Sequence, residues 1–214
     1  MKKLFIFFFM SIICLDVWSQ GKLKTQCKFG FKFGSGMQTI TGCPLKKIPR
    51  IAFMGGIWVQ IKISKSWTIQ AELTQIGKGT GLGLHQPKYG DYWLNLNYFE
   101  VPILFQYNKQ NGYFEFGPSL AGLINTGEYI KGGALPYQTD LYPISKKDFS
   151  FNLGAGYVFN DKWRVGLRLT HSLLPVRKQL PATSHPVYNR GIILAVSRQI
   201  NLKALRTRQS QDIE

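Results

Sequence analysis

The stretch WTIQAELTQIGKG, residues 67–79, alternates apolar and polar side chains over most of its length. Trp67, Ile69, Ala71 and Leu73 are apolar, and the residues between them are polar. Because successive side chains of a strand point to opposite faces, this alternation predicts a β-strand with two chemically different faces. The fold depends on what each face contacts: a protein core and water, or lipid and a polar lumen.

The composition of the 214-residue chain is that of a folded β protein. Hydrophobic residues make up 44% of the sequence and charged residues 18%, which excludes an intrinsically disordered chain. The aromatic share of 14% and the 22 glycines are typical of many strands joined by tight turns. After the N-terminal segment, no run reaches the ~18 apolar residues of a membrane-spanning helix. We therefore expect an all-β chain.

The N-terminal segment has the pattern of a secretory signal peptide. Lys2 and Lys3 precede an apolar run that extends from Leu4 to about Leu15, and Ser19 is a small residue at a suitable cleavage position. We therefore predict that residues 1–19 are removed on export.

The formal net charge of +16 indicates an anionic partner. Export, and the scattering of Lys and Arg among the turns, exclude nucleic acid as that partner. We expect affinity for anionic surfaces, so the predicted partners are outer-membrane lipids and lipopolysaccharide phosphates.

Eight segments with strand-like patterns follow the N-terminal segment. Each is near the ~9–11 residues that a tilted strand needs to cross a bilayer. The predicted strands are Lys28–Met37, Ile51–Ile63, Trp67–Lys78, Trp93–Tyr107, Tyr113–Asn125, Asp148–Phe159, Trp163–Leu173 and Asn189–Ile200.

The connections between these strands alternate between short and long. The short ones are residues 64–66, NKQNG at 108–112 and NDK at 160–162, and every other connection is much longer. An up-and-down meander places all short turns at one end and all long loops at the other. Outer-membrane barrels have this arrangement, with short periplasmic turns and long external loops.

The volume of a closed barrel decides which face points outward. The interior of an eight-stranded barrel is just wide enough to be filled by side chains. Large aromatic residues from every strand would overfill it, whereas glycines and polar residues of both signs fit. We predict a monomeric, eight-stranded antiparallel up-and-down transmembrane β-barrel with its apolar face toward lipid. The chain then divides into a signal peptide (1–19), a barrel domain (20–202) and a polar, basic tail (203–214).

Several aromatic residues near strand ends predict an interfacial belt. They are Trp58, Trp67, Trp93, Tyr107, Tyr113, Tyr157 and Trp163.

In each predicted strand, the positions that alternate with the apolar ones face the lumen. They carry acidic and basic residues that we expect to form a charge network there. Such a network is either a polar pathway or ligand site, or a structural filling in which buried charges pair; we favour the second. Its predicted members are Glu72, Glu100, Glu115, Arg164, Arg168 and Lys62.

The long connection at 126–147 is a candidate partner-binding loop. It carries Tyr129, Tyr137 and Tyr142 among Pro and Gly. Tyrosine-rich loops bind partners well, and tyrosines also lie at lipid interfaces, so both roles stay open.

An ordered series of segments resembles the small outer-membrane β-barrel family of Bacteroidota that includes the PorT-like proteins. The most specific segment is YFEVPILFQY at 98–107. KFGFKFGSG at 28–36 is also similar, although Ser35 stands where Asn is usual, and the chain departs from the family by continuing past Ile200. The other segments are IQAELTQIGKG (69–79), GPSLAGLI (117–124), FNLGAGYVF (151–159), RLTHSLLPV (168–176) and Asn189-Arg190. The resemblance implies an outer-membrane location and, for some members, a link to a secretion machine.

Three hypotheses for the function follow. The first is a non-enzymatic interaction or scaffolding role at the outer membrane, linked to secretion or envelope assembly, with no cofactor and no metal. The second is an outer-membrane enzyme whose external loops bring Ser184 and His185, or His85 and Asp91, together at one rim. The third is a soluble periplasmic β-barrel that binds an apolar ligand, with its Phe-rich face inward.

Overall fold

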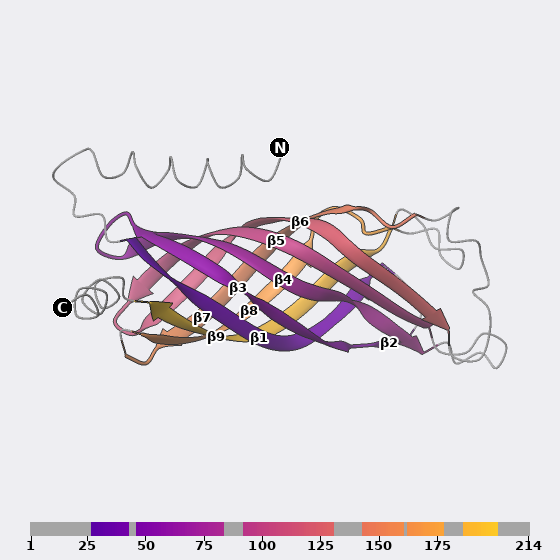
Figure 1. The fold of residues 1–214 in the computed structure, drawn as a ribbon, viewed down its shortest axis with the longest axis horizontal. Helices are drawn as coiled ribbons and strands as arrows, with labels where there is room; N and C mark the ends of the chain where they lie inside the picture. Colours follow the sequence, from indigo (N-terminus) through magenta and orange to yellow (C-terminus); the bar gives the residue numbers. More distant parts are fainter. Residues whose placement is uncertain are drawn as a thin grey trace, which may run out of the picture.

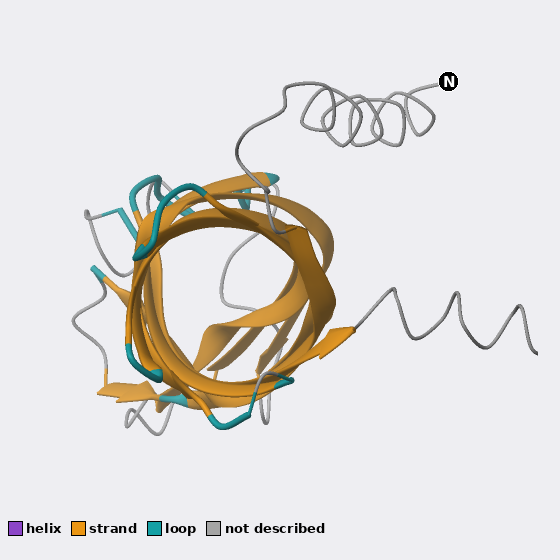
Figure 2. Ribbon diagram, turned by 90° about the vertical axis from the view of Figure 1, so that its left-hand side faces the viewer, coloured by secondary structure: helices purple, strands orange, loops and turns teal. Residues whose placement is uncertain are grey.

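The first and last strands of the described chain pair with each other and close the sheet into a barrel. The computed structural model describes residues 27–42, 46–83, 92–130, 143–160, 162–177 and 186–200. Strand β1 (Cys27–Thr41) pairs antiparallel with β3 (Arg50–Lys62) on one side and with β9 (Tyr188–Ile200) on the other. Viewed end-on, the strands form a complete ring (Figure 2).

Each remaining strand of the ring pairs antiparallel with its two neighbours in sequence (Figure 1). The predicted eight-stranded up-and-down barrel is therefore confirmed. The remaining strands of the ring are β4 (Trp67–Gly83), β5 (Tyr92–Lys109), β6 (Gly112–Ile130), β7 (Lys147–Val158) and β8 (Trp163–Ser172). The described residues contain no helix long and apolar enough to span a membrane.

The two ends of the barrel differ in their connections, as predicted. The turns from β3 to β4, β5 to β6 and β7 to β8 lie at one end, which we call the short-turn end. Strand β1 begins and β9 finishes there, because Phe29 pairs with Ile200. The four longer connections lie at the opposite end, which we call the long-connection end.

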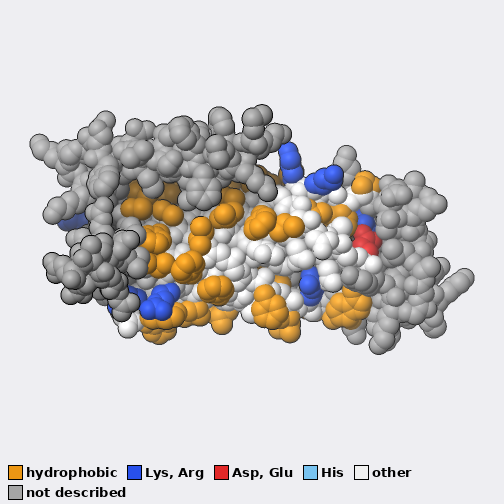
Figure 3. Space-filling model, viewed as in Figure 1, with side chains coloured by type: hydrophobic (Ala, Val, Ile, Leu, Met, Phe, Trp, Pro, Cys, Tyr) orange, Lys and Arg blue, Asp and Glu red, His pale blue; other side chains and the backbone are white. Residues whose placement is uncertain are grey.

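The outer wall of the barrel is apolar, and its interior is largely polar. Phe33, Phe53 and Leu120 are 66%, 74% and 65% exposed and point outward, whereas Lys32 and Glu72 are buried inside. Hydrophobic side chains spread along the visible wall (Figure 3). The predicted orientation is confirmed, and the alternative barrel with an inward Phe-rich face is wrong.

Three neighbouring strands extend beyond the rest at the long-connection end. Residues 79–82 of β4 pair with residues 92–95 of β5, and these pair in turn with residues 127–130 of β6. The short strand β2 (Lys46–Ile48) adds to the outer edge of β4. The result is a four-stranded sheet that projects from one side of the rim, which we call the rim sheet (Figure 1).

Two residues of the predicted aromatic belt lie inside the barrel, so the belt prediction is wrong for them. Trp58 is 1% exposed and Tyr113 is 6% exposed. The guanidinium carbon of Arg164 lies 5.2 Å from the ring centroid of Trp58 and 5.9 Å from that of Tyr113. Side chains alternate between the two faces of a strand, and both aromatic residues occupy positions on the face that points into the lumen. That alternation, and not closeness to a strand end, decides which way their side chains point.

Candidate functional site

A cluster of buried ion pairs crosses the lumen in the half nearer the short-turn end; we call it the inner cluster. Arg168 donates from Nη1 to Glu72 Oε2 at 2.8 Å and from Nη2 to Glu72 Oε1 at 2.8 Å. Its Nε donates to Glu115 Oε1 at 2.7 Å. Lys32 Nζ donates to Glu72 Oε1 at 2.5 Å. Each of the two carboxylates therefore has a cation beside it.

Arg164 joins the inner cluster through two glutamines. Its Nη2 donates to Gln60 Oε1 at 2.7 Å, and Gln60 Nε2 donates to Gln106 Oε1 at 2.6 Å. Gln106 Nε2 then donates to Glu115 Oε2 at 3.0 Å. Because these residues come from different strands, one continuous polar network connects opposite walls of the barrel.

The prediction that Lys62 belongs to the lumen network is wrong. Lys62 is the last residue of β3 at the short-turn end, and its side chain is exposed. No carboxylate of the described residues forms an ion pair with it. It has the parity of a lumen residue, but it lies beyond the closed part of the barrel.

A second buried cluster, the outer cluster, lies nearer the long-connection end and contains the predicted Glu100. Lys78 is six residues beyond Glu72 on β4, and its Nζ lies 2.8 Å from Glu100 Oε2 and 3.0 Å from Asp148 Oδ2. Asp148 Oδ2 also accepts hydrogen bonds from Ser172 Oγ at 3.0 Å and from Asn189 Nδ2 at 3.2 Å. Lys78, Asp148 and Asn189 were not among the predicted site residues.

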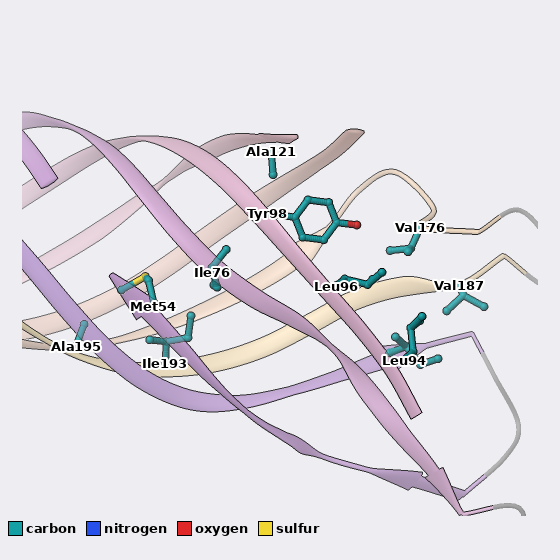
Figure 4. Packing of buried hydrophobic residues seen from close by; sticks show 11 residues of the cluster. Met54, Ile76, Leu94, Leu96, Tyr98, Ala121, Val176, Val187, Ile193 and Ala195 are labelled. Atoms are coloured by element: carbon teal, nitrogen blue, oxygen red, sulfur yellow. The ribbon is translucent and has the colours of Figure 1, made fainter. Parts of the chain in front are cut away.

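Apolar side chains fill the lumen beyond the outer cluster, and we call them the apolar cap. Leu94 and Leu96 precede the Glu100 position on β5, and Val176 and Val187 come from the connection between β8 and β9. Figure 4 shows these four residues near the long-connection end, with Met54 and Ala195 deeper in the barrel. The wider cluster comprises Ile40, Met54, Ile76, Leu94, Leu96, Tyr98, Ala121, Val176, Val187, Ile193 and Ala195.

Main-chain hydrogen bonds hold the apolar cap in place. Val176 N donates to Val187 O at 2.7 Å, and Ser145 N donates to Val176 O at 2.7 Å. The adjacent Arg177 forms a buried ion pair with Glu128 of β6. The described parts of the β8–β9 connection, at Val176, Arg177 and Val187, are therefore tied to each other and to the rim sheet.

The lumen is packed along its length, so it provides no open passage among the described residues. Gln60 and Gln106 near the short-turn end are 2% and 1% exposed, Asn152 and Lys78 are 0%, and Leu96 in the apolar cap is 0%. Side chains filling an eight-stranded barrel leave no water-filled channel. The arrangement supports a structural role for the charges.

One pair of buried residues resembles catalytic chemistry in type. Lys78 Nζ lies 3.4 Å from Ser150 Oγ, a combination that serves as nucleophile and base in some hydrolases. Both side chains are fully buried, so a substrate cannot reach the hydroxyl. No group of three His, Cys, Asp or Glu residues that could hold a metal ion occurs in the part of the chain that the structure describes.

Several predicted features lie outside the described residues. They include the signal peptide, the C-terminal tail, the loop residues Ser184, His185, His85 and Asp91, and two of the three loop tyrosines, Tyr137 and Tyr142. For Tyr129 the structure describes only the main chain, which forms part of β6.

Comparison with known proteins agrees with this geometry. A family model described as an outer membrane protein beta-barrel domain matches residues 18–177. No protein with a curated description matches the chain.

Solved structures that align with the chain include small outer-membrane barrels. Neisserial surface protein A aligns with a TM-score of 0.50 and 10% identity over 82% of this chain and 99% of its own. The attachment invasion locus protein Ail of Yersinia pestis aligns with a TM-score of 0.45 and 9% identity over 82% and 99%. OprG of Pseudomonas aeruginosa aligns with a TM-score of 0.40 and 10% identity over 82% and 94%. At this identity, the likeness to Neisserial surface protein A concerns the fold alone.

Proposed function

The chain belongs to the outer membrane protein beta-barrel domain family, and on that premise we propose that it is a non-conducting, non-enzymatic protein that binds partners at its external end. The observation that carries this proposal is the filled lumen. The inner cluster, the outer cluster and the apolar cap occupy successive levels of the barrel. In a barrel whose lumen is filled in this way, the surfaces that a partner can reach are the outer wall and the two ends.

The long-connection end is the end we assign to the cell exterior, because outer-membrane barrels carry their longer loops there. The rim sheet extends β4, β5 and β6 beyond the other strands at this end. It leads directly into the tyrosine-bearing connection that follows Ile130. A rigid sheet that presents a Tyr-rich loop suits recognition of another macromolecule.

The class of partner follows from the charge and from the resemblance to PorT-like proteins. A net charge of +16 favours anionic lipids and lipopolysaccharide around the barrel. The resemblance supports a protein partner in a secretion or envelope-assembly machine. The closed ring has no free sheet edge within the membrane, which supports a monomeric barrel.

Conductance tests the first half of the proposal. The purified full-length protein, inserted in a planar bilayer, is expected to give no single-channel steps. A variant with Glu72, Glu115 and Arg168 all replaced by Ala removes side chains of the inner cluster that fill the lumen. It is the positive control, which shows whether the assay detects conductance through an opened lumen. Regular conductance steps from the unaltered protein would contradict the proposal.

Photo-crosslinking in intact cells tests the second half. A crosslinking residue at position 129, 137 or 142 is expected to form a discrete adduct with another envelope protein. The same residue at position 109 or 162, at the short-turn end, is the matched control and is expected to lack that adduct. Identical adduct patterns at the two ends would mean that the loop has no partner of its own.

A further inference from the structure

The two buried clusters differ in their balance of charge. In the inner cluster, Lys32 and Arg168 are ion-paired with the two carboxylates of Glu72 and Glu115. Arg164 joins that cluster through Gln60 and Gln106, so the inner cluster carries one positive charge in excess. In the outer cluster, Lys78 is the one cation paired with two carboxylates, those of Glu100 and Asp148, among the described residues. Burying an unbalanced charge is costly unless an opposite charge compensates it.

Nearby basic residues do not supply the missing charge. Arg50 Nη1 donates to the main-chain oxygen of Lys78 at 3.0 Å and forms no ion pair with the carboxylates of the outer cluster. Arg177, at the apolar cap, is paired with Glu128. Within residues 27–42, 46–83, 92–130, 143–160, 162–177 and 186–200, the outer cluster therefore keeps one negative charge in excess.

Asp148 carries that excess unevenly on its two oxygens. Oδ2 accepts from Lys78, Ser172 and Asn189 at 3.0, 3.0 and 3.2 Å. Oδ1 accepts no hydrogen bond from any described residue, although Asp148 is 2% exposed. A carboxylate oxygen buried in this way is strongly attractive to a positive ligand.

A neighbouring amide oxygen shares this condition. Asn189, which is 1% exposed, commits its Nδ2 to Asp148, and its Oδ1 has no donor among the described residues. Exchanging the amide atoms would turn an oxygen toward the carboxylate, so the contact fixes the orientation. The hydroxyl of Tyr98 lies beside the Asn189 side chain and hydrogen-bonds with it, and the ring of Tyr98 lies 5.4 Å from Lys78 Nζ. The amide nitrogen of Gln38, which is 1% exposed, has no hydrogen-bond partner among the described residues.

We infer that the outer cluster binds one monovalent metal cation, with Asp148 Oδ1 and Asn189 Oδ1 as its protein ligands. Carboxylate, amide and hydroxyl oxygens are the donors that hard cations such as Na⁺ and K⁺ prefer. A single positive charge neutralises the excess, whereas a divalent ion would reverse it. The apolar cap separates the site from the exterior, and the inner cluster separates it from the periplasmic side.

Stability in different salts tests this inference on the full-length barrel in detergent micelles. Urea unfolding is followed by tryptophan fluorescence in KCl, NaCl or choline chloride at equal ionic strength. K⁺ or Na⁺ is expected to raise the unfolding midpoint to a saturating value, and choline, which is too large to enter, is not. At ten times its dissociation constant, the bound ion lowers the unfolding equilibrium constant about tenfold.

Two substitutions identify the site. Asp148→Asn removes the excess charge and is expected to abolish the difference between KCl and choline chloride. Glu115→Gln neutralises a buried carboxylate of the inner cluster, away from Asp148 and Asn189, and is expected to leave that difference intact, whatever it does to the absolute midpoint. Equal loss of the salt difference in both variants would overturn the assignment.

A direct probe covers the case in which a variant does not fold. Crystals of the unaltered protein grown with Rb⁺ or Tl⁺ are expected to show an anomalous peak in contact with Asp148 Oδ1 and Asn189 Oδ1. The absence of such a peak would overturn the inference. So would a urea unfolding midpoint that changes with pH but is the same in all three salts. The second result would mean that a proton neutralises the cluster.

Discussion

Arg168 on β8 and Glu72 on β4 meet in a two-pronged ion pair across the lumen, although their strands are not neighbours in the barrel. Both side chains are almost fully buried. The pair therefore braces two walls that main-chain hydrogen bonds connect only through intervening strands. Its geometry, with two parallel N–H···O bonds at 2.8 Å, is the strongest form of such a contact.

Replacing Arg168 with Met should destabilise the barrel by about 3–5 kcal/mol, because it leaves Glu72 and Glu115 buried with one fewer cation. Urea unfolding in detergent micelles measures the loss. Lys62→Met is the matched control: the exposed Lys62 lies outside the inner cluster, so its replacement should change stability by less than about 0.5 kcal/mol. Equal effects of the two changes would show that Arg168 does not brace the barrel.

A charge on the middle of the outer wall should oppose membrane insertion. Leu153 lies midway along β7 and is 51% exposed, so Leu153→Arg should cost about 2–4 kcal/mol in a bilayer. Ile63, just beyond the end of β3, is 48% exposed, and Ile63→Arg should cost about 0–1 kcal/mol. The yield of folded protein in vesicles measures both costs. An unchanged folding yield for Leu153→Arg would mean that this wall does not contact lipid.

Two glycines on the inner side make room for Tyr113. A Cβ at Gly156 would touch the ring carbons and hydroxyl of Tyr113, and a Cβ at Gly166 would touch the hydroxyl. Gly156→Ala should therefore cost about 1–3 kcal/mol. Gly122→Ala is the control, since a Cβ there meets no atom within 4 Å.

The steric cause can be separated from other effects of alanine by a double substitution. In a Tyr113→Ser background, Gly156→Ala should lose most of its cost, which a double-mutant cycle of unfolding free energies would reveal. An unchanged cost in that background would mean that the backbone of β7, not the tyrosine ring, requires glycine.

Expression in a Gram-negative host should place the protein in the outer-membrane fraction. The folded barrel should run at a different position on an SDS gel before and after boiling, since a closed sheet resists the detergent until heated. Recovery in the soluble periplasm without a mobility shift would contradict the lipid-facing orientation.

The strands and their orientation could be predicted from the sequence because alternation is a local property. All eight strands of the ring were located, including the one that contains Trp67–Gly79. Strand β2 was missed because three residues, Lys46–Ile48, are too few to show a period. The additional length of β4, β5 and β6 was missed as well, since their final pairs lie beyond the apolar band.

The inner parts of the site were harder to predict, because partners across a lumen depend on the register of many strand pairs. Arg168 and Glu115 were predicted together and do meet. The sequence pattern places Asp148 at the first position of a strand, and its contact with Lys78 follows only from the closed ring. The apolar cap has a detectable signal: Leu94 and Leu96 occupy positions that face the lumen, whereas Asn95 and Asn97 alternate with them on the other face, which inverts the pattern of the rest of the strand.

The brace between β4 and β8 bears on the order in which the barrel is assembled. Glu72 and Arg168 are 96 residues apart in the chain, and Gln60 and Arg164 are 104 apart. These contacts form only after the last strands arrive, and until then a partly inserted sheet would hold unpaired charges next to hydrocarbon. The membrane penalises every such intermediate by several kcal/mol per group. We therefore expect closure of the barrel and its insertion to be coupled, with little stability in any half-built form.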